Sequence, residues 1–529
     1  MKFFKCLSIS ISIFLNICVS AQIPGKEWDK TYGGKKDEEL KVVFQISDGG
    51  YIIAGSTKSN SNNKGGYDFV VQKLNAQGSL QWQRSFGGDK DDVLTSMLPL
   101  ADGGFIIGGS SASGKSPVIS QNSWGETDFW ILRINKKGEK LWDKRFGGIS
   151  IDNLTSIDLT SDGGFILGGY TWSDNNGNIS DTSRGKSDYW ILKINANGDK
   201  LWDKRFGGVD YDELYKVKEA VGGGYILAGY SYYGISGDKT EAGQGNCDYW
   251  VVKTDGNGNK LWDKRFGGLD YEHLYDMTQS TTGDIYLGGD SRSKASGDKS
   301  QSSRGKYDFW VVKMNSNGNK IWDRRFGGKE FDVLNCMQIA SDGSVLVGGE
   351  SVSGADGDKS QISKGQSDYW LLKIDAAGDK VWDVSFGGAE NDYLQSFQET
   401  NDGGYILGGI SRSNISGDKS QKANGGYDFW IVKAGNNLPR TVKSESLKSA
   451  ELILSITPNP ASNFIIIKCK KTTSHIQVLN SMGIVVNAPA EDLGENTFRI
   501  NVKDMQAGVY YIESITNTGE HFVEKWIKQ

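Results

Sequence analysis

Histidine is the side chain best suited to acid–base chemistry near neutral pH, and this chain of 529 residues contains three of them. His273, His475 and His521 lie far apart in unlike contexts, so they offer no obvious group for catalysis or for a zinc site. The His-Glu-x-x-His and Gly-x-Ser-x-Gly motifs are also absent. We therefore predict no catalytic residue and no ordinary hydrolase.

Composition narrows the class of protein further. The chain has 60 basic and 65 acidic residues and no strongly basic stripe, so nucleic acid is not an expected partner. Glycine-rich pairs end the expected strands and do not open helices, so phosphate or dinucleotide binding is not expected either. With 70 glycines, 7 prolines and 11% aromatic residues, the chain is rich in turns and too aromatic to be disordered.

Acidic residues recur at two places along most of the chain. One set precedes an aromatic residue at the start of an apolar segment, and the other lies four residues after a Gly-Gly pair. A catalytic carboxylate is needed once, whereas each of these occurs seven times, so we interpret both sets as acceptors for backbone N–H groups in glycine turns. The alternative for the second set is an acid ring at a channel mouth that draws in a cation, the one cofactor considered. The first set is Asp68, Asp128, Asp188, Asp248, Asp308, Asp368 and Asp428, and the second is Glu38, Asp92, Asp152, Asp212, Glu272, Asp332 and Asp392.

A repeat that dominates the sequence must position these acids. A Trp-x-x-x-(Phe/Tyr)-Gly-Gly element recurs after 54 residues once and then after 60 residues five times. Each copy holds four short segments rich in β-branched and aromatic residues, which is typical of β-strands. Asp-Gly-Gly and Asn/Asp-x-x-Gly segments between them predict tight hairpin turns. The element begins at Trp28, Trp82, Trp142, Trp202, Trp262, Trp322 and Trp382.

These features predict an all-β fold, with a seven-bladed β-propeller of four-stranded blades over residues 22–436. An open solenoid of hairpins is the alternative, but solenoids usually end in atypical capping repeats, and here the terminal copies keep the pattern. If the Trp strand is the outer edge of each blade, the first one completes the last blade beside the strand that begins at Asp428 and closes the ring. The repeats resemble the Gly- and Trp-rich propeller repeats of secreted Bacteroidetes proteins, with some kelch character.

The third and fourth strands of each copy are joined by a loop of about 16 residues, rich in Ser, Gly, Asp and Lys. Long loops on one face of a rigid scaffold are where binding residues concentrate. Four copies share a Gly-Asp-Lys core, and we predict that these loops bind a ligand; solvated loops without function are the alternative. Glu241, His273 and Trp124 are singular in the repeat but do not compose an acid–base pair. The candidate binding residues are Asp238, Lys239, Asp298, Lys299, Asp358, Lys359, Asp418 and Lys419.

The start of the chain is typical of a secretory signal peptide over residues 1–21. Lys2 and Lys5 precede an apolar stretch that is too short to span a membrane, and Val19-Ser20-Ala21 is a small-residue cleavage site. No transmembrane segment is expected in the mature chain.

The end of the chain departs from the repeat. A Ser/Lys-rich linker is expected over residues 437–452, and a different β pattern begins at residue 453. That pattern has Pro-Asn-Pro near its start, a Gly-x-Tyr strand late and a basic final strand. It resembles the type A C-terminal sorting domain of the type IX secretion system. The matching positions are Pro458, Asn459, Pro460, Gly508, Tyr510 and Lys528.

The resemblance implies that residues 453–529 form a small Ig-like β-sandwich and that the type IX machinery is a partner. It also implies export across both membranes of a Bacteroidetes cell, followed by release or attachment at the surface. We therefore expect a secreted or cell-surface protein whose propeller loops bind glycan or protein ligands in adhesion. The alternative is a propeller enzyme, a lyase or hydrolase of extracellular glycans, with its site at the channel mouth.

Overall fold

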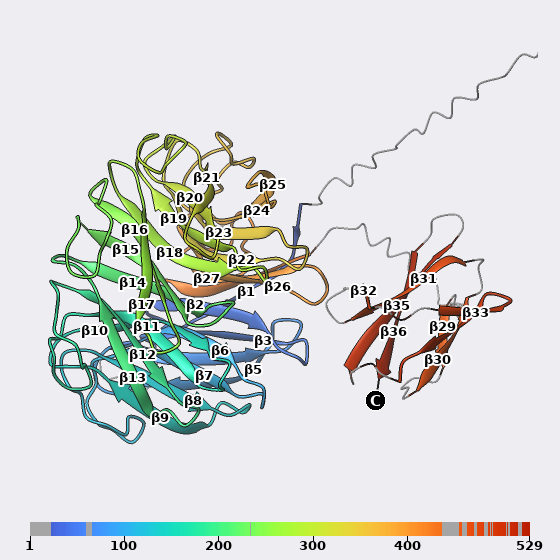
Figure 1. Ribbon diagram of the computed structural model, residues 1–529, viewed down its shortest axis with the longest axis horizontal. Helices are drawn as coiled ribbons and strands as arrows, with labels where there is room; N and C mark the ends of the chain where they lie inside the picture. The colour runs from blue at the N-terminus through green and yellow to red at the C-terminus, as the bar shows by residue number, and fades with distance from the viewer. Residues whose placement is uncertain are drawn as a thin grey trace, which may run out of the picture. The chain divides into compact units, whose positions relative to one another are not determined.

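The computed structural model describes residues 23–59, 66–232 and 234–435, and, in the C-terminal part, 454–457, 463–469, 473–480, 485–486, 488, 490–503, 505, 508–516 and 521–528. The chain divides into two compact units, residues 1–438 and 439–529, and each is described by itself (Figure 1). The expected signal peptide, the expected linker and Pro458–Pro460 lie outside the described residues.

The first unit is a ring of seven four-stranded antiparallel sheets within the described residues, and these sheets are the blades. Blade 1 comprises β2 (Glu38–Gln45), β3 (Tyr51–Thr57), β4 (Asp68–Leu74) and β5 (Leu80–Phe86), and blade 2 comprises β6 (Asp92–Pro99), β7 (Phe105–Ser111), β8 (Asp128–Ile134) and β9 (Lys140–Phe146). Blade 3 comprises β10 (Asp152–Leu159), β11 (Phe165–Thr171), β12 (Asp188–Ile194) and β13 (Lys200–Phe206), and blade 4 comprises β14 (Asp212–Glu219), β15 (Tyr225–Tyr232), β16 (Cys247–Thr254) and β17 (Lys260–Phe266). Blade 5 comprises β18 (Glu272–Gln279), β19 (Ile285–Ser291), β20 (Asp308–Met314) and β21 (Lys320–Phe326), and blade 6 comprises β22 (Asp332–Ile339), β23 (Val345–Ser351), β24 (Asp368–Ile374) and β25 (Lys380–Phe386). Blade 7 comprises β26 (Asp392–Glu399), β27 (Tyr405–Ser411), β28 (Asp428–Gly435) and β1 (Gly25–Tyr32).

The seventh blade closes the ring with the first strand of the chain. β1 pairs antiparallel with β28, from Gly25 opposite Gly435 to Tyr32 opposite Phe429. The Trp strand is the outermost strand of each sheet, as predicted. This pairing confirms the closed propeller and excludes the open solenoid.

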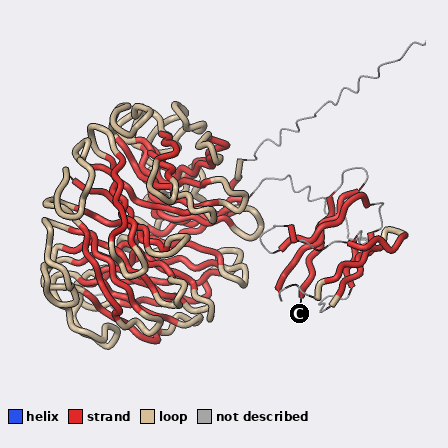
Figure 2. The backbone as a smooth tube through the Cα atoms, in the orientation of Figure 1, coloured by secondary structure: helices blue, strands red, loops and turns tan. Residues whose placement is uncertain are grey.

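The strands and loops fall in one order in every blade, and Figure 2 shows strands joined by loops, with no helix among the described residues. The innermost strands of all seven blades line a central cavity of about 460 Å³, called the channel below. Each innermost strand begins at the end of the ring that carries the Gly-Gly loops. The long Ser/Gly-rich loops, which join β3 to β4, β7 to β8 and the equivalent strands of the other blades, lie at the same end. That end is called the loop face below.

The turns at the opposite end have the chemistry that the sequence predicts. Gly163 of an Asp-Gly-Gly turn has φ of 81°, a left-handed conformation that glycine adopts without steric cost. The Asp162 carboxylate accepts a 2.9 Å hydrogen bond from the backbone N–H of Gly164 in the same turn. Gly198 of an Asn-x-x-Gly turn also has φ of 81°. Both hairpin predictions are confirmed.

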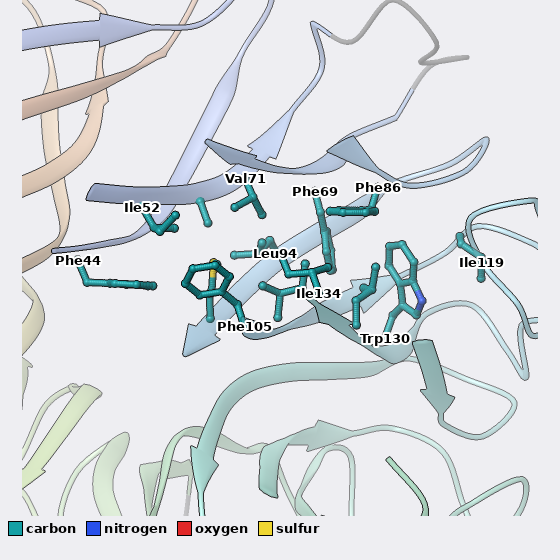
Figure 3. Packing of buried hydrophobic residues seen from close by; sticks show 14 residues of the cluster. Phe44, Ile52, Phe69, Val71, Phe86, Leu94, Phe105, Ile119, Trp130 and Ile134 are labelled. Carbon is teal, nitrogen blue, oxygen red and sulfur yellow. The ribbon is translucent and has the colours of Figure 1, made fainter. Parts of the chain in front are cut away.

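The hydrophobic core lies between neighbouring blades. Figure 3 shows one such layer, in which Phe69 of blade 1 packs against Trp130 of blade 2 with ring centroids 4.9 Å apart. Tyr189 and Trp250 make the same contact between blades 3 and 4, at 4.7 Å. Trp130 and Trp250 are at most 1% exposed, so these tryptophans are packing residues and not ligand platforms.

The second unit is a small β-sandwich. One sheet has the order β29 (Leu454–Thr457), β30 (Phe464–Cys469), β34 (Thr497–Asn501) and β33 (Ala490–Gly494). The other has the order β32 (Val485–Val486), β31 (Thr473–Asn480), β35 (Gly508–Thr516) and β36 (His521–Lys528). Side chains of both sheets, including Ile465 and Trp526, form one core. The expected sandwich is therefore present.

Candidate functional site

The seven acids that begin the innermost strands are structural. Asp212 accepts a 2.6 Å hydrogen bond from the backbone N–H of Gly208, and Asp92 accepts a 2.8 Å bond from that of Gly88. Equivalent bonds join the carboxylates of the other five blades to their Gly-Gly loops. All seven acids are 0–2% exposed. The acid ring that would draw in a cation is therefore a wrong interpretation, because Glu38, Asp92, Asp152, Asp212, Glu272, Asp332 and Asp392 are buried in glycine turns. Across the described residues, no group of three or more His, Cys, Asp or Glu side chains is arranged to hold a metal ion.

The acids of the first set, which begin β4, β8, β12 and the equivalent strands of the other blades, lie beside the acids that begin the innermost strands. Asp188 accepts a 3.0 Å hydrogen bond from the backbone N–H of Arg184. A Cβ on Gly207 would lie 1.9 Å from the Asp188 carboxylate, so the first glycine of the Gly-Gly pair is needed for this close approach. Burial raises the pKa of Asp128 to about 6 and that of Asp212 to about 7. Neighbouring buried carboxyl groups therefore lie at the blade junctions, and burial raises the pKa of several of them.

The lysines of the Gly-Asp-Lys loops are buried, contrary to the prediction that they contact a ligand. Lys299 is 2% exposed and donates hydrogen bonds to the hydroxyls of Ser291 (2.8 Å) and Ser303 (2.9 Å). Burial lowers the pKa of Lys299 to about 8. Lys359 donates to the backbone oxygen of Ser353 at 2.9 Å. These ammonium groups fold the loop onto its own blade, and the same burial holds for Lys239, Lys299, Lys359 and Lys419.

The aspartates of these loops brace neighbouring repeats. Asp298 is 2.7 Å from Arg265 of the preceding blade, and Asp358 is 2.8 Å from Arg325. Asp238 lies 3.0 Å from Arg184, and Asp418 pairs with Lys364. Their charges are thus already paired, so the loop cores of Asp238, Asp298, Asp358 and Asp418 serve the scaffold.

One segment matches the sequence motif of a phosphate-binding loop but lacks the helix that such a loop needs. Residues 109–116 read Gly-Ser-Ser-Ala-Ser-Gly-Lys-Ser, but Gly109 lies within β7, and no helix follows it in the described chain. A phosphate-binding loop needs the N-terminus of a helix behind it. This segment therefore fits no such site.

Residues that repeat in every blade build the scaffold, so a specialised site must come from positions that differ between blades. One such position is the second residue of the innermost strand. It pairs in register with a residue near the end of the next strand of the same blade, which is β3 in blade 1 and β7 in blade 2. It lies between the invariant acid and an invariant leucine. The pairs are Glu39–Ser56, Val93–Ser110, Asn153–Tyr170, Glu213–Tyr230, His273–Asp290, Val333–Glu350 and Tyr393–Ile410.

Blades 4 and 5 carry two hydrogen-bonded pairs at this position. His273 Nδ1 lies 3.0 Å from Asp290 Oδ1, and the Tyr230 hydroxyl donates a 2.6 Å bond to Glu213 Oε2. The rings of Tyr230 and His273 are 5.1 Å apart, so the two pairs touch across the blade junction. Burial raises the pKa of Asp290 and of Glu213. We call these four residues the mouth cluster, since they lie near the loop-face end of the innermost strands.

The mouth cluster continues into the channel and into blade 6. Tyr215 and Tyr275 line the channel, and their rings are 5.3 Å apart. Glu350 accepts a 2.6 Å hydrogen bond from the side-chain amide of Asn335. Burial raises the pKa of Glu350 to about 7. Acids, phenols and one imidazole therefore gather in blades 4–6.

A chain of rings, called the aromatic arc below, leads from the loop face of blade 3 to that of blade 6. Aromatic side chains in contact typically have ring centroids about 4.5–7 Å apart. The successive centroid distances here are 5.5 Å for Trp172–Tyr211, 6.0 Å for Tyr211–Tyr232, 6.2 Å for Tyr232–Tyr230, 5.1 Å for Tyr230–His273, 6.1 Å for His273–Tyr307 and 5.9 Å for Tyr307–Phe331. Trp172 is 42% exposed and Phe331 is 40% exposed. The arc thus offers solvent-facing rings at both ends.

A pocket adjoins the blade 6 end of the arc. Tyr307 and Phe331 line it together with Arg292, Lys294 and Lys306, and its volume is about 890 Å³. Lys306 Nζ lies 4.5 Å from the centre of the Phe331 ring. A stacked pair of rings with polar side chains around it suits a ligand that has both apolar faces and hydroxyls.

The structure gives a different role to each of the three residues that occur in only one copy of the repeat. Glu241 is 2.6 Å from Lys264 and accepts a hydrogen bond from the backbone N–H of Arg265, so it supports a loop. Trp124 lies exposed on the loop face. His273 belongs to the mouth cluster, and its partner Asp290 was missed because it lies on the neighbouring strand. Comparison of the seven copies at this pair of register positions would have identified both His273 and Asp290.

The fold defines the protein as a seven-bladed β-propeller joined to a small β-sandwich. Residues 455–529 match the family model described as "Secretion system C-terminal sorting domain". The chain is therefore exported by the type IX secretion machinery, with which this domain interacts, to the cell surface or the extracellular space. This finding confirms the expected sorting domain and the expected location. No described helix is long and apolar enough to cross a membrane.

The chain is also similar, at low sequence identity, to other known proteins. The chain is 24% identical over 197 residues to the regulatory protein FlaEY of Caulobacter vibrioides, covering 35% of this chain and 20% of that protein. It thus spans about a fifth of the length of this curated relative. The Neurospora crassa Pan2 WD40 domain covers 75% of this chain and 89% of its own at 12% identity, with a TM-score of 0.42. A protein of unknown function from Bacteroides caccae covers 63% of this chain and 93% of its own at 12% identity, with a TM-score of 0.33.

Proposed function

We propose that the exported propeller is a binding protein for extracellular glycans, and that its site is the aromatic arc and mouth cluster of blades 3–6. The supporting observation is that a continuous series of ring contacts and hydrogen-bonded polar pairs runs through blades 3–6, in a ring whose repeated side chains serve the scaffold. The residue just before the innermost-strand acid supports the proposal for blades 4–6, where it is Tyr211, Tyr271 and Phe331. In blades 1, 2, 3 and 7 it is Asp37, Asp91, Ile151 and Asn391.

The chemistry of the arc fits sugars. A pyranose ring presents C–H groups on its faces and hydroxyls around its edge, so it stacks on an aromatic ring while its edge bonds to polar side chains. Tyr307 and Phe331 stack at an interplanar angle of 18°, and Arg292 and Lys306 lie beside them. Several weak subsites along the arc act together on a polymer through their effective concentration.

A protein ligand is the second candidate, and a different observation favours it. Ile149, Val209 and Leu269 occupy the same place in three consecutive Gly-Gly loops and are 64–71% exposed. Neighbouring apolar side chains exposed on one face are typical of protein–protein contacts. These residues lie on the loop face, as the aromatic arc does.

Binding of the mature protein to arrayed glycans, alongside pull-down from extracellular protein extracts, tests both candidates. We expect glycan binding that is lost in a variant with Trp172→Ala, Tyr307→Ala and Phe331→Ala. A variant with Ile149→Ser and Val209→Ser should keep it, because neither residue lines the Tyr307–Phe331 pocket, whereas Leu269 does. If only the second variant loses its ligand, and that ligand is a protein, the glycan proposal is wrong.

A further inference from the structure

We propose that the mouth cluster is also a hydrolytic site, in which His273 and Asp290 remove acyl groups from O-acylated neutral glycans. The inference rests on the proposed function, because the aromatic arc holds the glycan next to His273. It assigns an activity to residues whose pairing the sequence pattern did not reveal.

The geometry of the pair suits a general base. Asp290 Oδ1 lies 3.0 Å from His273 Nδ1, and the side chains are 5% and 19% exposed, respectively. A buried carboxylate that accepts from Nδ1–H fixes the imidazole ring and leaves the lone pair of Nε2 as the base. The His273 side chain is therefore partly accessible to water.

Tyr275 supplies a hydrogen-bond donor near this base. It follows His273 by two residues on β18, and the two rings are 6.2 Å apart. Burial raises the pKa of Tyr275, so its hydroxyl keeps its proton. The described residues provide no hydrogen-bond partner for this hydroxyl, which lines the channel. A free phenol of this kind stabilises negative charge that develops on a carbonyl oxygen.

The surroundings select the class of substrate. The charged groups at the register positions around His273, which are Glu213, Asp290 and Glu350, are acidic, so they disfavour the carboxylate of a uronic acid there. The basic Arg292, Lys294 and Lys306 lie in the Tyr307–Phe331 pocket. Their carboxyl groups bond to Tyr230, His273 and Asn335, which leaves no free carboxyl pair to flank a glycosidic bond. An ester on a neutral sugar needs only one base that later acts as an acid, and His273 fits that role.

The reaction balances with water as the only co-reactant. His273 Nε2 takes a proton from water while the water oxygen forms a bond to the acyl carbon, and Tyr275 donates to the carbonyl oxygen as it becomes negative. The adduct then collapses, and the bond from the acyl carbon to the sugar oxygen breaks. The sugar oxygen keeps the electron pair and takes the proton from the imidazolium. The products are a carboxylic acid and a free sugar hydroxyl.

Release of acetate from acetylated xylan and from p-nitrophenyl acetate by the full mature chain tests the inference. We expect His273→Asn to lower kcat by at least ~100-fold, the usual contribution of a general base. Tyr275→Phe should lower kcat by about 100-fold, as loss of an oxyanion donor does. Asp290→Asn should lower kcat with KM unchanged, and Asp290→Glu should restore part of it, because Asp290 positions the base. Tyr393→Phe alters the register position of His273 in blade 7 and is the matched control that keeps full activity.

The outcomes separate this inference from glycan binding. If the protein binds acetylated glycans through the aromatic arc but releases no acetate, the hydrolytic inference is wrong and the binding proposal stands. If His273→Asn and wild type release acetate at the same rate, the inference is also wrong. If acetate release depends on His273 while the arc variant binds glycans as wild type does, the binding proposal falls instead.

Discussion

The indole N–H of Trp430 donates a 3.1 Å hydrogen bond to the carboxylate of Asp29, 401 residues away in the sequence. The same bond occurs within a single repeat elsewhere, for example between Trp190 and Asp203 at 3.1 Å. The first strand of the chain therefore occupies, in the last blade, the place that the repeat's own Trp strand occupies in the others.

Ring closure predicts how the protein responds to loss of β1. Deleting residues 25–32 should lower the stability and solubility of the propeller well beyond the loss of one strand, because β28 becomes an exposed edge that pairs with other chains. Thermal unfolding and light scattering measure these effects. Asp29→Ala and Asp203→Ala are the matched pair, and each should cost about 1–3 kcal/mol through one unsatisfied buried indole. A truncated protein as stable and monomeric as the parent would contradict the closure account.

Buried carboxyl pairs predict that stability falls as pH rises toward neutrality. Burial raises the pKa of Asp248, Asp308 and Asp392 to about 6 and that of Asp212 to about 7, from 3.8. In this window the folded state holds protons that the unfolded state has released, so stability is full below about pH 4 for these groups and is lost by about pH 7. The pKa of Asp203 is lowered instead, so the stability that this group contributes is present above about pH 4 and is lost only in stronger acid.

Thermal unfolding at pH 5 and pH 8 measures this dependence, with the higher Tm expected at pH 5. The Asp212→Asn variant keeps an acceptor for the N–H of Gly208 without a titrating group, so its Tm should change less between the two pH values. An unchanged difference in this variant would show that other groups cause the effect.

Because the loop lysines are buried, replacing one of them should lower the stability of the propeller and leave ligand binding unchanged. Lys299→Met removes the ammonium group that bonds to Ser291 and Ser303, and it should cost about 1–3 kcal/mol of unfolding free energy. Exposed Lys294, in the same loop, is the control, and Lys294→Met should leave Tm unchanged within error. A stable Lys299→Met variant with weakened glycan binding would restore the loop as a ligand site.

The role of the sorting domain predicts the cell compartment in which a chain without it accumulates. A chain that lacks residues 453–529 should fold its propeller but remain in the periplasm, because the address read by the type IX machinery is missing. Fractionation with an antibody against the propeller measures this. Arrival of the truncated protein in the medium or on the cell surface at normal levels would show that export does not depend on these residues.

The sequence predicted the scaffold well because its determinants are local and repeated. Asp162-Gly163-Gly164 specifies a hairpin by its own backbone preferences, and seven in-register copies specify the ring. The site was less predictable, because His273 and Asp290 meet through strand pairing. The buried role of Lys299 was also hidden, since a lysine in a Ser/Gly-rich loop is usually solvated and its serine partners come from the fold.

The affinity of the mature protein for its glycan, measured by titration calorimetry for two multiple variants, tests the central claim most directly. One variant carries Trp172→Ala, Tyr307→Ala and Phe331→Ala, and the other carries Asp238→Ala, Asp298→Ala, Asp358→Ala and Asp418→Ala. Each ring contributes about 1 kcal/mol, so we expect the first variant to bind roughly 100-fold more weakly. The second should bind as wild type does, with a lower Tm. Undiminished binding by the first variant, with loss of binding by the second, would contradict the account.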